Sequence, residues 1–326
     1  MISNENVYGG FMSKSSKLTG RKQLTIHFSG GLGNQLFQLT YLKFQEARGL
    51  KVNGEYGTLP VRKNSFGHPW IEEICVPKIS LKKTRLHRKL IFRVFIFIMH
   101  RKQYFYLRTT RLTKGFALSR GIFSKTKTKI ITEIGFNPEI HYPHSGDLFG
   151  YFQSNHWADL IVSQNFVKIP KLPSELYSRA LIENPLIVHV RIGDYSENPE
   201  MGILGVDYYH TGISEFLNSC PNASIWLFSD TPESALSRIP IEFHKIVHFM
   251  DSPNDSPLET LEKMRLGAGY VLANSTLSWW AAYLAYNSSA PVFAPSPWFK
   301  ELVEPKNLFP SNWVRRDARW EHSSGR

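Results

Sequence analysis

Apolar runs and stretches of helical periodicity alternate regularly through the second half of this chain. The apolar runs predict strands at 186–190, 224–228, 245–249, 269–273 and 291–294, the last of these being the final strand. Helices are predicted near 174–183, 207–218, 232–238, 257–267 and 276–286. Strands separated by helices indicate βαβ crossovers, and such crossovers produce a parallel sheet. The fold class is therefore α/β.

The first half opens in the same way. The run LTIHFS from Leu24 predicts a strand, the glycines after it predict a turn, and Gln35 to Arg48 has the spacing of a helix. With 326 residues, the chain is long enough for two domains with a core each. We therefore expect two α/β domains with a ligand cleft between them. The expected divisions are a flexible extension at 1–23, a first domain at 24–165, a linker at 166–184, a second domain at 185–297 and a tail at 298–326.

Charge and cysteine content narrow the class of protein. The net charge of +12 favours an anionic partner, such as nucleic acid, anionic lipid or a phosphorylated substrate. Two cysteines, Cys75 and Cys220, are too few for a disulfide scaffold and fit a reduced compartment. The first 23 residues lack the apolar core of a secretory signal, and the longest apolar run, at 90–99, is interrupted by Arg93. We expect a cytoplasmic protein, soluble or attached to the inner face of the plasma membrane.

The segment 78–129 differs from the rest of the chain. It is rich in Lys and Arg, interleaved with aromatic and aliphatic residues, and it has no acidic residue. Such a segment can attach to an anionic membrane surface, bind nucleic acid, or form a solvated face that covers the first domain. After it, ITEIGFNPEI and DLFGYFQSNHW return to strand and loop character.

The segment Pro185–Tyr195, PLIVHVRIGDY, carries the strongest functional signal. A buried strand is followed at once by Arg191, Asp194 and Tyr195, with Gly193 relaxing the backbone between them. Ligands of open α/β sheets bind outside the carboxyl ends of the strands. An arginine there suits a phosphate, because its planar guanidinium stays charged and binds two oxygens at once. A phosphorylated ligand is the first hypothesis.

Three further motifs lie at predicted strand ends. In GGLGNQLF (30–37), the glycines allow a backbone to approach a ligand, and Asn34 either caps the helix or offers its amide. In ANSTLSWWAAYLA (273–285), Asn274 or Ser275 caps a helix whose N-terminus is an anion site, while Trp279, Trp280 and Tyr283 have the spacing of core packing. In WLFSD (226–230), Asp230 either accepts hydrogen bonds from a ribose or guanine or caps the next helix.

Several reaction classes lack their motifs here. The glycine turn does not match the dinucleotide fingerprint or the P-loop, and the chain has no zinc motif and no G-x-S-x-G. It also has no D-x-D pair, whereas enzymes that hold a nucleotide diphosphate through a divalent cation usually need clustered carboxylates. We therefore expect no metal site and no cofactor.

Taken in order, GGLGNQLFQ, GYFQS, HVRIGDY, FSD and ANSTLSWWAAYL closely resemble the bacterial α-1,2-fucosyltransferases of glycosyltransferase family eleven. The resemblance spans about Leu24 to Pro297. It implies a GT-B fold of two Rossmann-like domains facing a cleft. It also implies GDP-fucose as the donor, inversion at the fucose anomeric carbon, no metal, and a galactose-containing acceptor in a surface glycan such as lipopolysaccharide O-antigen.

The resemblance also implies roles for individual residues. Arg191 would hold the β-phosphate and Asp230 would contact guanine. The complete set expected to bind GDP-fucose is Gly31, Gly33, Asn34, Gln35, His189, Arg191, Asp230, Asn274, Ser275, Thr276 and Ser278. Many members have a second arginine where this chain has Ile192, which weakens any role for a second guanidinium. The segment 78–129 matches no motif of the family.

A mechanism follows from the chemistry of the departing diphosphate. Its growing negative charge needs prearranged donors, which a fixed guanidinium and a helix N-terminus supply. Arg191 and Asp194 are therefore the expected catalytic residues. The general base stays open: Asp194, Glu197, Glu200 or none, if the transition state is loose. The alternatives are a fucosyltransferase of another linkage, or a basic protein that binds membranes or nucleic acid without catalysis.

Overall fold

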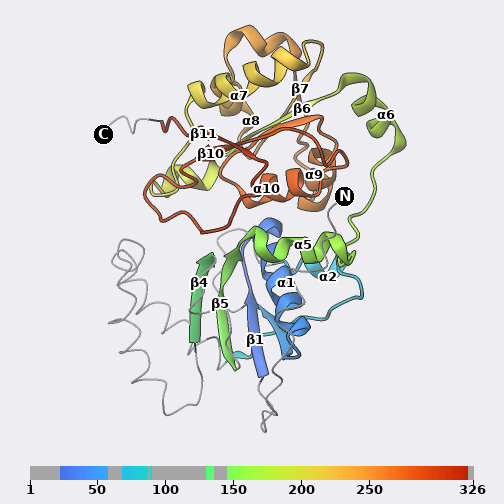
Figure 1. The fold of residues 1–326 in the computed structure, drawn as a ribbon, viewed down its shortest axis with the longest axis vertical. Coiled ribbons are helices and arrows are strands. Elements are labelled where there is room, and N and C mark those ends of the chain that lie inside the picture. The colour runs from blue at the N-terminus through green and yellow to red at the C-terminus, as the bar shows by residue number, and fades with distance from the viewer. Residues whose placement is uncertain (1–22, 58–67, 87–88, 90–129, 136–144, 322–326) are drawn as a thin grey trace.

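The computed structural model describes residues 23–57, 68–86, 89, 130–135 and 145–321 (Figure 1). These ranges leave out residues 1–22 of the expected extension and most of the basic segment 78–129. The predictions made for them, including membrane attachment, therefore stay predictions. The described residues form two α/β domains stacked along the long axis of the molecule.

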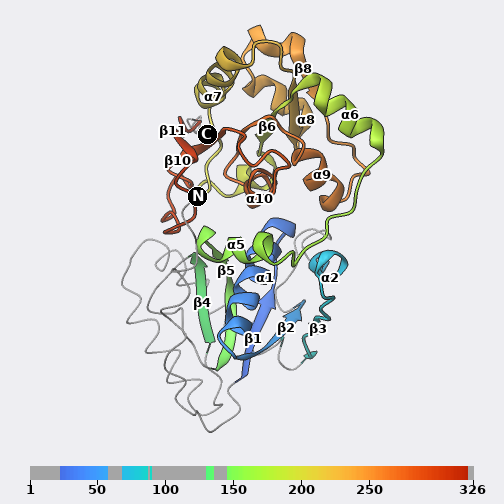
Figure 2. The same ribbon diagram turned by 45° about the vertical axis from the view of Figure 1, so that its right-hand side comes forward.

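The N-terminal domain is built on a five-stranded parallel sheet with the order β3-β2-β1-β5-β4. Its strands are β1 (Gln23–Phe28), β2 (Lys51–Tyr56), β3 (Lys82–Lys83), β4 (Ile130–Gly135) and β5 (Gly146–Gln153). Its helices are α1 (Leu32–Ala47), α2 (Ile71–Ile74) and α5 (Asn155–Ser163). Figure 2 shows α1 packed over the sheet, with α5 beside α1 at the upper end of β5.

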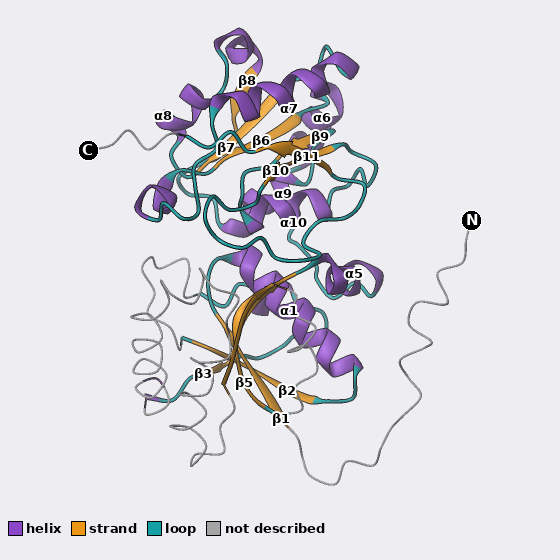
Figure 3. Cartoon of the chain, turned by 60° about the vertical axis from the view of Figure 1, so that its left-hand side comes forward, coloured by secondary structure: helices purple, strands orange, loops and turns teal. Residues whose placement is uncertain are grey.

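The C-terminal domain is built on a six-stranded parallel sheet with the order β11-β10-β9-β6-β7-β8 (Figure 3). Its strands are β6 (Leu186–Val190), β7 (Ile225–Ser229), β8 (Val247–Phe249), β9 (Gly269–Val271), β10 (Val292–Ser296) and β11 (Val314–Asp317). The helices are α6 (Ser174–Glu183), which precedes the sheet, α7 (Val206–Ser219), α8 (Pro232–Ala235), α9 (Pro257–Met264) and α10 (Thr276–Tyr283). The predicted fold class, α/β with two Rossmann-like domains in the manner of GT-B enzymes, is confirmed.

Two predicted elements are wrong in ways that bear on function. The helix expected from Gln35 begins at Leu32, because Gly31 is its N-cap and Asn34 lies inside its first turn. The run at 291–294 is not the final strand, since β11 pairs with β10 inside the segment expected to be a tail. Three of the four residues of β11 are charged, so it has no apolar run to predict it.

Both sheets have a topological switch point at a strand near the middle of the sheet. β1 lies between β2 and β5, and β6 lies between β7 and β9, so the connections leave each central strand in opposite directions. At such a point the loops after neighbouring strands diverge, and ligands bind at the carboxyl ends between them. The places of interest are therefore the ends of β1 and β5 in one domain and of β6 and β9 in the other.

The domains meet through α1 and α10. A Cβ on Gly33 would lie 2.4 Å from the backbone carbonyl carbon of Thr276, so the first turns of the two helices touch backbone to backbone. The Phe37 ring packs 4.7 Å from Trp279 and 4.9 Å from Trp280, both fully buried. The prediction that these tryptophans belong to the core is confirmed. This contact brings the first turn of α1, which follows β1, against the first turn of α10, which follows β9.

Candidate active site

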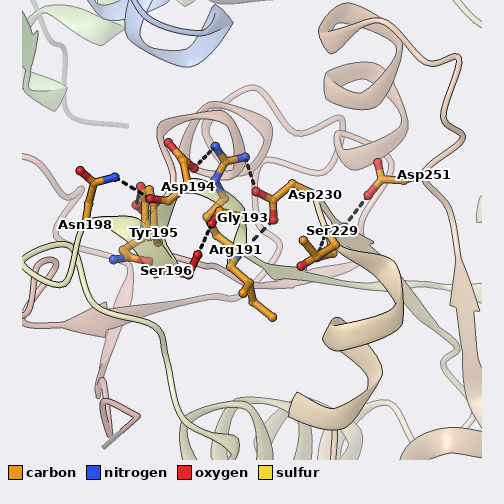
Figure 4. A network of polar contacts seen from close by, with 12 residues as sticks. Arg191, Gly193, Asp194, Tyr195, Ser196, Asn198, Ser229, Asp230 and Asp251 are labelled. Atoms are coloured by element: carbon orange, nitrogen blue, oxygen red, sulfur yellow. Dashed lines mark hydrogen bonds and ion pairs between the residues drawn. The ribbon is translucent and has the colours of Figure 1, made fainter. Parts of the chain in front are cut away.

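The Arg191 side chain lies between two carboxylates directly after β6 (Figure 4). Its Nη2 donates to Asp194 Oδ1 at 2.6 Å, and its Nη1 lies 3.2 Å from Asp230 Oδ2. The guanidinium also lies over the Tyr195 ring, 5.5 Å from its centroid. About 21% of the Arg191 side chain is exposed, so it belongs to neither the packed interior nor the open surface.

The backbone between these residues fixes the cluster. Asp194 stands in a short 3-10 helix, Gly193–Glu197, that follows β6. The Ile192 N–H donates to Asp230 Oδ1 at 3.1 Å, which ties the loop after β6 to the end of β7. A Cβ on residue 193 would lie 2.0 Å from Asp230 Oδ2, so only glycine allows this approach.

Asp230 does not cap the helix after it, and that interpretation is corrected here. The N-cap of α8 is Thr231, whose own N–H donates to Ser229 Oγ at 3.0 Å. Both oxygens of Asp230 instead face Ile192 and Arg191. The role expected for it at guanine stays a prediction.

The charges around β6 favour one fixed cation beside a neutral imidazole. Burial opposes the charge of Arg191, but Asp230, Tyr195 and Asp194 outweigh it and raise the pKa of the guanidinium. Burial, and then the charge of Arg191, lowers the pKa of His189 to about 3. His189 is therefore neutral at pH 7, with one ring nitrogen that donates a hydrogen bond and one that accepts.

The residues after β9 complete the switch point. The Tyr195 hydroxyl donates to the Asn274 carbonyl at 2.8 Å, which joins the loops after β6 and β9. The Asn274 amide donates to the carbonyls of Met201 and Gly202, so it supports the loop after Arg191 instead of capping α10. Ser275 is the N-cap, and within the described chain its side chain makes no capping hydrogen bond. The N-terminus of α10 therefore has no side-chain cap among the described residues, and an uncapped helix N-terminus can bind an anion.

The remaining residues predicted to bind the donor differ in how close they lie to Arg191 and the residues that contact it. Ser275 is 8% exposed, Thr276 is half-buried, and both lie at the start of α10. Ser278 is fully buried and its hydroxyl donates to the Ser275 carbonyl at 3.0 Å, so the structure does not bring it to the group. Gln35 is turned toward the carbonyls of Gly30 and His68.

The glycine loop of the N-terminal domain lies at the other switch point. Gly31 caps α1 in an extended conformation, and Gly33 touches α10. The Asn34 Oδ1 accepts a hydrogen bond from Gln153 Nε2 at 3.1 Å, which joins the loop after β1 to the end of β5. The loop therefore reaches the domain boundary beside the start of α10.

Buried polar atoms without a partner gather at these strand ends. In the described part of the chain, His189 Nδ1, Thr231 Oγ1 and Asn274 Oδ1 make no hydrogen bond, and they lie in or just after β6, β7 and β9. In the same described ranges, Gln35 Oε1 near the end of β1 and Gln153 Oε1 at the end of β5 are also buried without a hydrogen-bond partner. Unpaired buried polar atoms are costly in a folded protein. Their placement at both switch points makes this boundary the candidate site for a polar ligand.

Two residues at the site escaped prediction. Tyr151, at the end of β5, lies close enough to Asp194 for that charge, after burial, to raise the pKa of its phenol. The Asp251 carboxylate accepts from the Ser229 N–H, and burial raises its pKa to about 6 against that hydrogen bond. GYFQS pointed to the neighbourhood of Tyr151, but nothing in the sequence distinguished Asp251 from any other loop aspartate.

Within the described ranges, no three His, Cys, Asp or Glu side chains gather in a way that could hold a metal ion. Among the helices described there, none combines the length and apolar character that crossing a membrane requires. Over the same residues, Cys75 and Cys220 are free thiols, as the sequence predicted.

The chain belongs to glycosyl transferase family 11, whose family model matches residues 148–316. It is similar to the O-antigen biosynthesis glycosyltransferase WbnK of Escherichia coli, with 24% identity over 316 residues that cover 88% of this chain and 98% of that protein. It is also similar to an α-1,2-colitosyltransferase of Escherichia coli, with 29% identity over 137 residues, 40% of this chain and 47% of that protein. The resemblance seen in the sequence is thereby confirmed, and the chain is a glycosyltransferase.

Among solved structures, the chain is similar to NodZ α-1,6-fucosyltransferase co-crystallised with GDP. The identity is 13%, the coverage is 82% of this chain and 93% of that one, and the TM-score is 0.39. It is also similar to POFUT1 in complex with GDP-fucose, with 11% identity, 83% and 97% coverage and a TM-score of 0.41.

Proposed function

We propose that this glycosyltransferase moves L-fucose from GDP-fucose to the 2-hydroxyl of a galactose residue in a surface glycan such as lipopolysaccharide O-antigen. The observation that carries the proposal is the Arg191 guanidinium, held between Asp194 and Asp230 at the switch point where β6 ends. The names of the two Escherichia coli relatives support an O-antigen product and an α-1,2 linkage.

The diphosphate is the part of the donor that the site suits best. Arg191 offers a permanent positive charge, and α10 offers first-turn N–H groups at the positive end of its dipole. Asp194 and Asp230 already neutralise the charge of the Arg191 guanidinium. A phosphate is therefore bound most strongly when the guanidinium and the N-terminus of α10 bind it together. We propose that this pair replaces the divalent cation that other nucleotide-sugar enzymes use, and that no metal takes part.

The transfer itself is a single displacement. The oxygen of the acceptor hydroxyl attacks the anomeric carbon of fucose, while the bond from that carbon to the β-phosphate oxygen breaks and the anomeric configuration inverts. The bond electrons leave with GDP, whose new charge Arg191 and the α10 N-terminus stabilise. The proton of the acceptor hydroxyl passes to a carboxylate.

Asp194 is the best placed of the three candidate bases. Glu197 is exposed, whereas Asp194 adjoins both Arg191 and Tyr151 of the other domain. A base must stand near the leaving group and also face the acceptor. Asp194 contacts Arg191, which we place at the leaving group, and adjoins Tyr151 of the other domain, where we place the acceptor.

The name of the second relative supports a competing donor sugar. By its name, that relative transfers colitose. Residues that bind the nucleotide of the donor do not distinguish one transferred sugar from another. A different linkage is the other open alternative, because linkage depends on how the acceptor is held. Family membership counts against a binding protein without catalysis.

The test offers the purified protein GDP-fucose or nucleotide-activated colitose, with methyl glycosides of β-galactose, N-acetylgalactosamine and glucose as acceptors. We expect transfer of fucose to the galactoside in the presence of a metal chelator, and an α-1,2 linkage by NMR of the product. Transfer of colitose alone, a different linkage, or a requirement for a divalent cation would each overturn the corresponding part of the proposal.

A further inference from the structure

The end of β5 departs from regular strand geometry. Phe152 has a φ of 51°, in the left-handed region that non-glycine residues avoid, and Gly150 has a φ of 155°. The register between β4 and β5 shifts beside this point, between Glu133 and Gly135. An irregularity of this kind re-aims the side chains next to it.

The surrounding contacts hold this conformation in place. The Phe152 ring is buried and stacks on Tyr41, with centroids 4.0 Å apart and planes 6° apart. The Trp157 indole N–H donates to the Phe152 carbonyl at 2.8 Å, and Gln38 Nε2 donates to the Gly150 carbonyl at 2.7 Å. A strained backbone fixed from several sides is typical of functional sites.

The irregular end places Tyr151 at the boundary between the domains. Its ring lies beside the glycine loop, where a Cβ on Gly30 would come within 3.2 Å of Tyr151 Cε1. Its phenol lies near enough to Asp194 and Tyr195 of the other domain that the Asp194 charge raises the pKa of Tyr151 and Tyr151 in turn raises the pKa of Tyr195. Burial and the Asp194 charge raise the pKa of Tyr151, so the phenol keeps its proton at neutral pH and can donate it in a hydrogen bond.

The two tyrosines beside Asp194 differ in what their hydroxyls do. The Tyr195 hydroxyl donates to the Asn274 carbonyl and holds the nucleotide-side loops together. The Tyr151 hydroxyl makes no hydrogen bond to any residue in the described ranges. Two residues further on, Gln153 is 4% exposed and its Oε1 is also unpartnered within those ranges. The end of β5 therefore carries a hydroxyl and an amide oxygen, two residues apart, that have no hydrogen-bond partner among the described residues.

We propose that the end of β5 is the acceptor-sugar subsite, in which the Tyr151 hydroxyl donates a hydrogen bond to an oxygen of the acceptor sugar and Gln153 accepts one from its hydroxyls. This inference rests on the proposed function and names the residues that hold the second substrate. A sugar suits the pair because each of its hydroxyls both donates and accepts. Tyr151 comes from the domain opposite Arg191, so a sugar bound to it lies next to Asp194.

The experiment measures binding, not turnover, so that it separates this inference from the identity of the donor. Affinities for GDP and for methyl β-galactoside, with N-acetylgalactosaminide and glucoside in parallel, are measured by NMR titration for the wild type, Tyr151→Phe and Gln153→Glu. The control is Tyr286→Phe, which removes a hydroxyl bound to Glu262 outside the site. Thermal unfolding checks that each variant folds.

We expect Tyr151→Phe to weaken binding of the preferred glycoside about three- to tenfold, the usual effect of one lost hydrogen bond, with GDP affinity unchanged. Gln153→Glu keeps an acceptor oxygen but loses the Nε2 donor to Asn34 Oδ1, so it should also lower the melting temperature, and Tyr151→Phe is the variant that decides. The control should match the wild type for both ligands. The inference is overturned if Tyr151→Phe binds every glycoside normally, if it loses GDP and glycoside affinity equally, or if the wild type binds no glycoside. A wild type that binds glycosides but transfers no fucose would instead refute the proposed donor.

Discussion

The guanidinium of Arg191 is held from two sides by carboxylates of different origin. Asp230 is fixed by the Ile192 N–H and the absence of a side chain at Gly193, so it sets where the guanidinium stands. Asp194 is on a short 3-10 helix and lies near Tyr151, which belongs to the other domain. We infer that Asp230 orients the cation and that Asp194, although it accepts a hydrogen bond from Arg191, is the carboxylate that takes part in the reaction.

Asp194→Asn tests this division of roles. If Asp194 is the general base, its amide should lower kcat about 10²- to 10⁴-fold, the usual contribution of such a group. GDP should bind at least as tightly as before, because a negative charge next to the diphosphate is removed. Steady-state kinetics and calorimetric titration with GDP measure the two effects. Glu197→Gln on the same short helix is the matched control; a larger fall in kcat for that variant would assign the base to Glu197 instead.

At this scale the sequence predicts which residues stand at strand ends, but not which of them touch. Arg191, Asp194 and Asp230 could each be named because parallel strands end at one edge. Their contact depends on the loop after β6 folding toward β7, which residue types alone do not specify. Tyr151 could not be singled out, because regular alternation along β5 does not anticipate a left-handed Phe152.

Among the elements, some were predicted to the residue, while most predicted strands of the C-terminal sheet differ by one or two residues at an end. The bounds of β6 (Leu186–Val190) and α6 (Ser174–Glu183) agree with prediction. The start of α1 was misplaced because a glycine cap leaves no side-chain signal, and β11 was missed because it is an edge strand rich in charge. Weak signals of this kind occur where tertiary contacts, rather than local preference, decide the structure.

The missed strand β11 also supports the site. Leu204 pairs with Trp320 and the Gly205 N–H donates to the Arg319 carbonyl at 2.8 Å, so the last residues pack on the loop that Asn274 holds. Trp313, just before β11, is 9% exposed. Residues 313–320 therefore have a structural role in the C-terminal domain.

Truncation after Asn312 should reveal this role. It removes Trp313, β11 and the pairing of Trp320, and loss of one buried tryptophan alone costs about 3–5 kcal/mol. We expect the melting temperature to fall by about 10 °C or the protein to become insoluble. Differential scanning fluorimetry measures the change. The matched control ends at Glu321, so that it keeps every described residue. An unchanged melting temperature after Asn312 would show that β11 is dispensable.

For the whole molecule, function depends on bringing two sheet edges together. The apolar contact of α1 with α10, made possible by Gly33, joins the loop after β1 to the helix after β9. The Tyr283 hydroxyl adds a hydrogen bond to Asp159 of α5. The sequence predicted two α/β domains with parallel sheets, but not this contact, because a backbone-to-backbone approach involves no side-chain pattern. The expected cleft between the domains stays a prediction.

The proposed mechanism depends above all on Arg191, which we expect to hold the diphosphate of the donor from the C-terminal domain. Calorimetric titration of GDP into the wild type and into Arg191→Ala, with a metal chelator present and folding checked by melting temperature, tests it most directly. The account predicts that the variant stays folded and binds GDP about 10- to 100-fold more weakly, since a charged hydrogen-bond donor is lost and two carboxylates are left beside the phosphates. An affinity for GDP equal to that of the wild type would contradict it.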